Sequence, residues 1–127
     1  MKCQWKEQGR STVDIKATTE KNRELFNDLA AAHILSGCDT VAFLWGIGKV
    51  TVVKAIRAGH KLRKLGNVNA EAKDVLAEAT SFVAACYGSK LTTDMSSVQY
   101  EVWTSKMSNK KITSAPELKC LPPTTDL

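Results

Sequence analysis

Apolar side chains recur with a helical period in the first third of the chain. From Asn22 they return every three or four residues, which places them on one face of a helix. Gly37 follows the last of them and is a natural helix stop. We therefore expect a helix whose buried face is made of Leu25, Phe26, Leu29, Ala30, His33 and Ile34.

A glycine-rich turn comes next and predicts a change of direction. Asp39 or Thr40 can cap a short helical turn through Leu44. Gly46-Ile47-Gly48 then reverses the chain into a second helix from about Lys49. Helix pairs use glycines simply to reverse direction, but a turn of this kind also leaves backbone N–H groups free and lets another backbone approach closely. Such a turn can face a phosphate.

The spacing of apolar residues predicts the second helix, although the intrinsic propensities of its residues favour a strand. Residues 50–53 are mostly β-branched, and propensity alone favours a strand. On a helical wheel, however, Val52 and Ile56 share one side. The opposite side holds Lys54, Arg57 and Lys61. We expect Gly59 to end or bend this helix.

Two further helices are predicted in the second half. Asn69 is the expected N-cap of an amphipathic helix that ends at Gly88. Ser96 or Ser97 starts a last helix before Ser108. The residues expected on the buried sides are Val75, Leu76, Ala79, Phe82, Val83, Cys86 and Tyr87 in the first, and Val98, Val102 and Trp103 in the second.

These elements predict a small all-α domain with loose ends. At 127 residues and 43% hydrophobic content, the chain is long enough for one modest core. Residues 1–18 are expected to be a flexible arm, extended or at most a short edge strand. Residues 19–107 form the helical domain, and residues 108–127, with three prolines, are an irregular tail.

The positive charge is concentrated in one segment. The chain has 18 Lys and Arg against 13 Asp and Glu, and no acidic residue lies between Asp39 and Glu71. Without the six cations of that segment the balance is 12 against 13, so the segment holds the whole excess of +5. Local basicity next to a phosphate-facing turn favours nucleic-acid binding. The six cations are Lys49, Lys54, Arg57, Lys61, Arg63 and Lys64.

Several other chemistries are disfavoured. A dinucleotide fingerprint needs glycine where Thr51 stands, and a Walker loop needs Ser or Thr where Val50 stands. The four cysteines are scattered without paired ligand spacing, and neither histidine has a catalytic partner nearby. The chain lacks a secretory signal and any apolar run long enough for a membrane span, so we expect an intracellular protein with reduced cysteines.

The turn and the residues before it resemble a known element. Gly37-Cys38-Asp39 and Gly46-Ile47-Gly48 have the separation found in the helix-hairpin-helix of flap-endonuclease and PIN-like structure-specific nucleases, and Leu44 and Ile56 match its apolar positions. The resemblance places a helix-hairpin-helix at residues 37–58. The wider run over residues 31–124 is similar to uncharacterised nuclease-like proteins associated with mobile elements in animal genomes.

The resemblance has specific implications for Asp39 and the turn. The aspartate at that position in the nucleases belongs to a carboxylate cluster that holds two divalent metals, and the hairpin grips DNA phosphates, often through a monovalent cation. Asp39 is thus either a helix cap or a ligand for Mg²⁺ or Mn²⁺. Two-metal hydrolysis needs several carboxylates, of which only Asp39 matches here. Lys49 replaces a frequent proline, and Val50 replaces a usual basic residue.

We therefore expect sequence-independent binding of the DNA backbone by a truncated nuclease-like protein of the nucleus, without catalytic residues of its own. Two alternatives remain: part of a Mg²⁺-dependent structure-specific nuclease completed by another segment, and a helical protein-interaction module. The predicted DNA-binding residues are Gly46, Ile47, Gly48, Lys49, Lys54, Arg57, Lys61 and Lys64.

Overall fold

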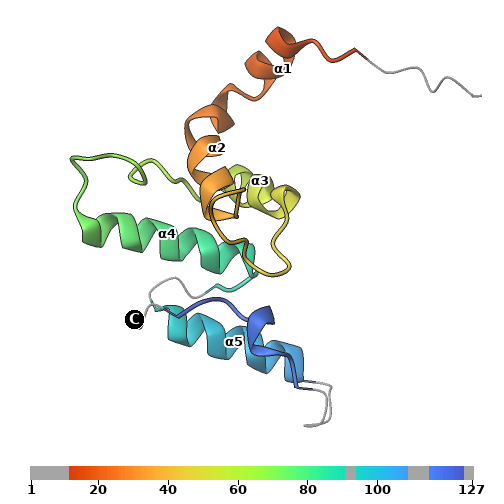
Figure 1. Ribbon diagram of the computed structural model, residues 1–127, viewed down its shortest axis with the longest axis vertical. Helices are drawn as coiled ribbons and strands as arrows, with labels where there is room; N and C mark the ends of the chain where they lie inside the picture. The colour runs from red at the N-terminus through yellow and green to blue at the C-terminus, as the bar shows by residue number, and fades with distance from the viewer. Residues whose placement is uncertain (1–11, 91–93, 109–114, 125–127) are drawn as a thin grey trace, which may run out of the picture.

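The computed structural model describes residues 12–90, 94–108 and 115–124. Over these ranges it is helical, and the all-α fold expected from the sequence is confirmed (Figure 1). The described part contains no strand, only an isolated bridge between Cys38 and Val41. The helices are α1 (Ile15–Lys21), α2 (Arg23–Leu35), α3 (Lys49–Arg57), α4 (Ala72–Cys86) and α5 (Met95–Met107), followed by a 3-10 turn, Leu118–Cys120.

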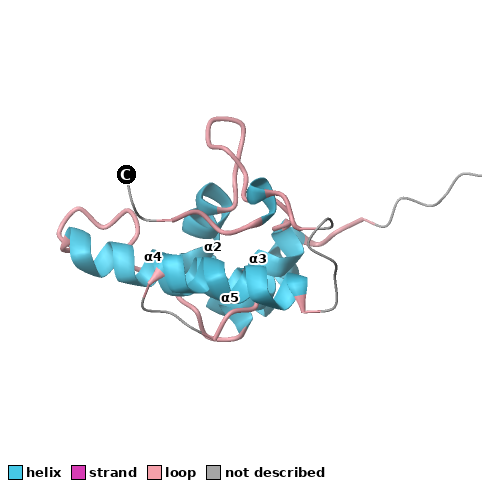
Figure 2. Ribbon diagram, turned by 90° about the horizontal axis from the view of Figure 1, so that it is seen from below, coloured by secondary structure: helices cyan, strands magenta, loops and turns pink. Residues whose placement is uncertain are grey.

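The helices pack around two apolar clusters that meet at α4. In Figure 1, α2 and α3 lie above α4, and α5 lies below it; Figure 2 shows the same helices from below. Leu35 is half-buried and packs against both clusters. The upper cluster contains Leu25, Ala32, Val52, Ala55, Ile56, Leu62, Phe82 and Cys86. The lower cluster contains Val83, Ala84, Met95, Val98, Val102 and Leu121.

Helix α2 packs with a face that shares only Leu25 with the predicted one. Its buried residues are Leu25, Asp28 and Ala32. The side chain of Asp28 is fully buried, and its Oδ1 accepts a hydrogen bond of 2.9 Å from the Leu62 backbone N–H. A hydrophobicity pattern assigns an aspartate to solvent, whereas this one holds the loop after α3 against α2. The face made of Phe26, Leu29 and Ile34 consequently remains exposed, and the prediction that it is buried was wrong.

The predicted loose ends contain ordered segments. Asp14 caps α1 by accepting a hydrogen bond of 3.0 Å from the Ala17 N–H, so residues 15–18 are helical and form neither the extended segment nor the edge strand expected there. No residue of α1 is buried. In the predicted irregular tail, Leu121 and Pro122 are buried, and the Pro122 carbonyl accepts a hydrogen bond from Gln99. Residues 1–11, 109–114 and 125–127 lie outside the described ranges.

Two helix starts also differ from the predictions. Helix α4 begins at Ala72 with Glu71 at its N-cap, not at Asn69. Helix α5 begins at Met95, because the Asp94 carboxylate accepts the Ser97 N–H at 2.9 Å and caps the helix there. Several polar residues near each start can serve as caps, so the sequence alone places a helix start only to within a few residues. Leu76 and Trp103, which we expected to be buried, are exposed.

Candidate nucleic-acid interface

The hairpin between α2 and α3 begins with a tight reversal at Asp39. Cys38 and Val41 exchange two backbone hydrogen bonds, of 3.0 and 3.2 Å, across Asp39 and Thr40. The predicted helical turn through Leu44, with Asp39 or Thr40 as its cap, is therefore wrong. Both side chains stand exposed at the tip of this turn.

Gly37 makes this reversal possible. Its φ is +95°, and a Cβ at this position would lie 2.4 Å from the Cα of Phe43. A left-handed backbone and a close approach both require glycine here. Gly37 thus ends α2, as predicted, and also allows the hairpin to fold back against the end of that helix.

The Gly46-Ile47-Gly48 turn presents an open backbone at the start of α3. Gly46 has a φ of +76°, and Gly48 is the N-cap of α3 without a side-chain capping bond. A Cβ at either glycine would meet nothing within 4 Å. The half-buried Ile47 packs against the upper cluster and anchors the turn. The first N–H groups of α3 have no intrahelical acceptors, so the turn leaves donors accessible to an anion.

Lys49 is exposed, but its ammonium group reaches the end of α2. Its Nζ donates hydrogen bonds to the His33 carbonyl (3.0 Å), the Ser36 hydroxyl (2.7 Å) and the Gly37 carbonyl (2.6 Å). These acceptors lie at the C-terminal end of α2, where helical carbonyls lack partners and the helix dipole favours a cation. Lys49 therefore clamps the start of α3 to the end of α2. The sequence pattern predicted a DNA contact for this charge and gave no sign of its contact with α2.

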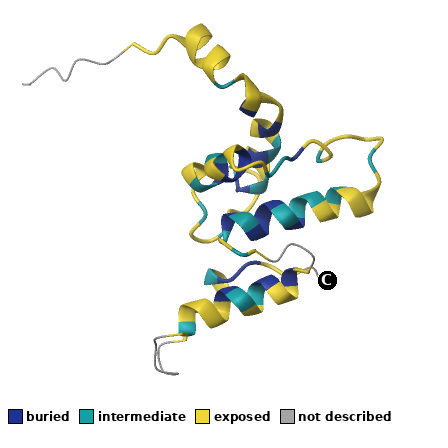
Figure 3. Ribbon diagram, turned by 180° about the vertical axis from the view of Figure 1, so that it is seen from behind, coloured by how far each residue is buried: buried dark blue, intermediate teal, exposed yellow. Residues whose placement is uncertain are grey.

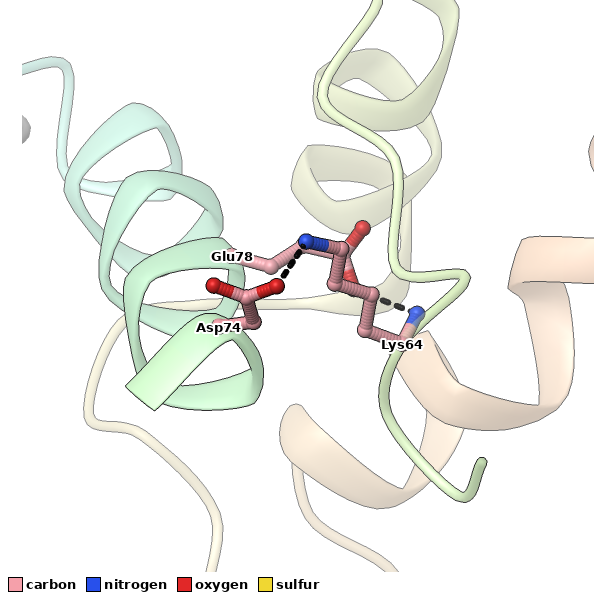
Figure 4. A network of polar contacts seen from close by, with 3 residues as sticks. All are labelled: Lys64, Asp74 and Glu78. Atoms are coloured by element: carbon pink, nitrogen blue, oxygen red, sulfur yellow. Dashed lines mark hydrogen bonds and ion pairs between the residues drawn. The ribbon is translucent and has the colours of Figure 1, made fainter. Parts of the chain in front are cut away.

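Acidic residues distant in the sequence neutralise two other cations of the segment. Lys64 Nζ lies 2.6 Å from Asp74 Oδ2, and the Lys64 backbone N–H donates to Glu78 Oε2 at 2.7 Å (Figure 4). The pKa of Lys64 is raised, chiefly by its hydrogen bond with Asp74. Lys61 Nζ lies 3.8 Å from the buried Oδ2 of Asp28. Carboxylates of α2 and α4 therefore balance part of the positive charge of this segment, although the segment itself contains no acidic residue.

The exposed cations that remain lie on and just after α3. Val50, Lys54 and Arg57 are exposed and occur at i, i+4 and i+7, whereas Val52 and Ile56 are buried, as the periodicity predicted. Lys54 has no hydrogen bond or ion pair within the described ranges. Arg57 donates to Asn22 Oδ1 at 3.2 Å and keeps an exposed side chain. The exposed Arg63 follows on the loop after α3 and likewise has no ion pair with a described residue.

Asp39 belongs to no cluster of potential metal ligands in the described part of the chain. No group of three or more His, Cys, Asp or Glu side chains that could hold a metal occurs among those residues. The donor set around Asp39 therefore does not fit a two-metal centre, which requires several carboxylates.

Exposed aromatic side chains border the glycine turn, a feature that the sequence analysis did not single out. The rings of Phe43 and Trp45 stack with their centroids 6.4 Å apart. Lys119 Nζ lies 4.7 Å from the centroid of the Trp45 ring. Val41, Phe43 and Trp45 alternate along the chain, and this alternation is the signal that could have identified them.

Comparison of the chain with protein-family models, with curated proteins and with solved structures gave no match. The relationship to helix-hairpin-helix nucleases consequently stays a prediction. Among the helices of the described residues, none has the length and apolar character needed to cross a membrane.

Proposed function

We propose that the protein binds the backbone of duplex DNA without sequence preference, through the glycine turn and the exposed face of α3. The observation that carries the proposal is the placement of Lys54 and Arg57 on one exposed helical face, directly after an open turn with free N–H donors. Backbone N–H groups at a helix start and nearby cations are the usual partners of phosphate oxygens.

The residues proposed for this contact are fewer than the sequence suggested. The backbone of Gly46 and Gly48 contributes donors and space, and Lys54, Arg57 and Arg63 contribute charge. Three predicted lysines are left out: the Lys49 ammonium group bonds to the end of α2, and Lys61 and Lys64 have acidic partners. With so few phosphate contacts, we expect weak binding that falls steeply with salt, because each neutralised phosphate releases counterions.

A salt titration of DNA binding tests this proposal. Fluorescence anisotropy with a labelled duplex compares the native chain with Lys54→Ala/Arg57→Ala. The slope of log K against log salt is expected to decrease by about 1.8 when two phosphate contacts are lost. The matched control is Lys73→Ala/Lys106→Ala, which removes the same charge from exposed positions on α4 and α5. Equal weakening by the two variants, or no salt dependence, would refute the proposed surface.

Gly48→Ala tests the turn separately. The added methyl group meets no atom within 4 Å in the fold, so the variant is expected to remain folded. Within the proposal it reduces DNA affinity, because the methyl group occupies the space through which a phosphate reaches the N–H groups. Unchanged affinity in a folded variant would exclude the turn from the binding surface.

The nuclease alternative has less support. A catalytic role for Asp39 needs further carboxylates, and the described residues do not supply them. We also propose a nuclear location, which imaging of the tagged protein can check.

A further inference from the structure

An apolar groove runs between α2 and α3, and Lys49, the residue after the glycine turn, is among the residues that line it. It has a volume of about 590 Å³. Phe26 is 66% exposed and Leu29 45%, although the sequence pattern predicted both to be buried. In Figure 3 much of the α2 ribbon is coloured as exposed. The lining residues are Phe26, Leu29, Ala30 and His33 from α2, and Lys49, Val52 and Val53 from α3.

The spacing of the lining residues suits a helical occupant. The four residues from α2 occur at i, i+3, i+4 and i+7, so they form a continuous wall about 10 Å long, at 1.5 Å per residue. The three residues from α3 occur at i, i+3 and i+4 and form the facing wall. A groove between two helices with such walls accepts the apolar face of a third helix.

The charges at the edges of the groove are basic. Arg23 precedes Phe26 by three residues and is exposed on the same side of α2. Arg57 follows Val53 by one helical turn and contacts Asn22, just before the start of α2. Cations thus flank the end of the groove at which α2 begins.

Acidic side chains are absent from the described walls of this groove. Helix α3 contains no acidic residue. On α2, Asp28 is buried on another face, and Glu24, four residues earlier, shares that face. A second copy of this chain would bring the same basic edges and an excess charge of +5, which disfavours self-association through the groove.

We propose that the groove docks an amphipathic helix of another protein, whose apolar side chains enter between α2 and α3 and whose flanking Asp and Glu residues pair with Arg23 and Arg57. The proposal does not rest on DNA binding, because Phe26, Leu29 and Arg23 are not among the residues proposed to contact DNA. Arg57 is the one residue assigned to both surfaces. Apolar contact supplies the affinity, and the basic edges select an acidic partner.

A designed peptide provides the test. The probe is a fluorescent helix with leucines at i, i+3, i+4 and i+7 and glutamates at most other positions. It is titrated with the full chain and compared with a peptide that has lysine for glutamate and with a scrambled peptide of the same composition. The acidic amphipathic peptide is expected to bind at least about tenfold more tightly than either.

Matched variants locate the binding site. Phe26→Ala is expected to weaken peptide binding at least about tenfold, because it removes the largest apolar anchor. Tyr100→Ala removes a similarly exposed aromatic ring (70%) from α5 and is expected to leave binding unchanged. Arg23→Glu is expected to weaken the acidic peptide and to strengthen the lysine peptide. Far-UV circular dichroism checks that each variant is folded.

Several results would overturn the proposal. The scrambled or lysine peptide binding as well as the acidic one would show non-specific adhesion. Sedimentation velocity that detects a dimer abolished by Phe26→Ala would identify a second copy as the occupant, and Phe26-dependent binding to anionic vesicles without peptide binding would identify a lipid surface. Retention of DNA binding by Phe26→Ala is expected, which would distinguish the apolar contacts of the groove from the DNA contacts.

Discussion

Replacing Lys49 with methionine removes an ammonium group that joins two helices. In the native fold this group donates to two carbonyls and one hydroxyl at the end of α2, at 2.6 to 3.0 Å. Methionine keeps most of the apolar stem, so the variant isolates the polar contacts. If Lys49 is a clamp, its loss destabilises the fold; if it is a DNA contact, its loss weakens binding and leaves stability unchanged.

The expected loss of stability for Lys49→Met follows from these contacts. One hydrogen bond to a charged group contributes about 1.5 to 3 kcal/mol, and we count the three bonds of the exposed Lys49 together as about 3 kcal/mol, because water competes for its ammonium group. Its position at a helix C-terminus adds about 0.5 kcal/mol. Holding the lysine side chain in place costs up to about 2 kcal/mol of conformational entropy. The net effect is about 1.5 kcal/mol, which is roughly a tenfold change in the folding equilibrium.

Urea denaturation followed by far-UV circular dichroism measures this loss for Lys49→Met. The control is Lys54→Met, which makes the same chemical change at an exposed lysine without contacts in the described structure and is expected to alter stability by less than about 0.5 kcal/mol. A lower midpoint with an unchanged m-value for Lys49→Met alone supports the clamp. Equal stability of the two variants, together with an equal loss of DNA affinity, would refute it.

Two further predictions concern the glycines of the hairpin and the reactivity of two cysteines. Gly37→Ala is expected to lower the free energy of unfolding by about 3 kcal/mol or more, because residue 37 has a left-handed backbone and its new Cβ would meet the Phe43 backbone. Gly48→Ala is expected to lower it by less than about 1 kcal/mol, because Gly48 has an ordinary φ and open space around it. Thermal unfolding of the two variants measures the difference. The pKa of the Cys38 thiol is lowered, chiefly by its side-chain hydrogen bond with a neighbouring hydroxyl, and burial raises that of Cys86 to about 11. Since the thiolate is the reactive form, iodoacetamide at about pH 8 is expected to modify Cys38 well before Cys86, and mass spectrometry that finds the opposite order would contradict these pKa shifts.

Helix α3 illustrates how much of the fold could be predicted. Its β-branched residues favour a strand, but the period of its apolar positions predicted a helix with Val52 and Ile56 inside and Lys54 and Arg57 outside. The structure confirms this arrangement. Periodicity succeeded because a helix in a small domain gains most of its stability from burying one face, and this outweighs small differences in propensity.

The buried face of α2 could not be predicted in the same way. Apolar residues lie on more than one side of this helix, and the pattern alone favoured the side with Phe26 and Leu29. The choice depended on Asp28, whose carboxylate accepts a hydrogen bond from Leu62, 34 residues away. A contact between residues so far apart in the sequence does not affect the spacing of apolar residues along α2. The groove between α2 and α3 could therefore be identified only from the structure.

The sequence by itself determined the helical fold, the glycine that ends α2 and the basic character of the segment after the hairpin, because helix period, backbone freedom and charge are properties of neighbouring residues. Tertiary structure decided which of those charges remain available. It placed Lys49 against the end of α2 and paired Lys64 with Asp74 from α4. Charge is encoded locally, but its neutralisation depends on distances between residues far apart in the chain, and only folding sets those distances.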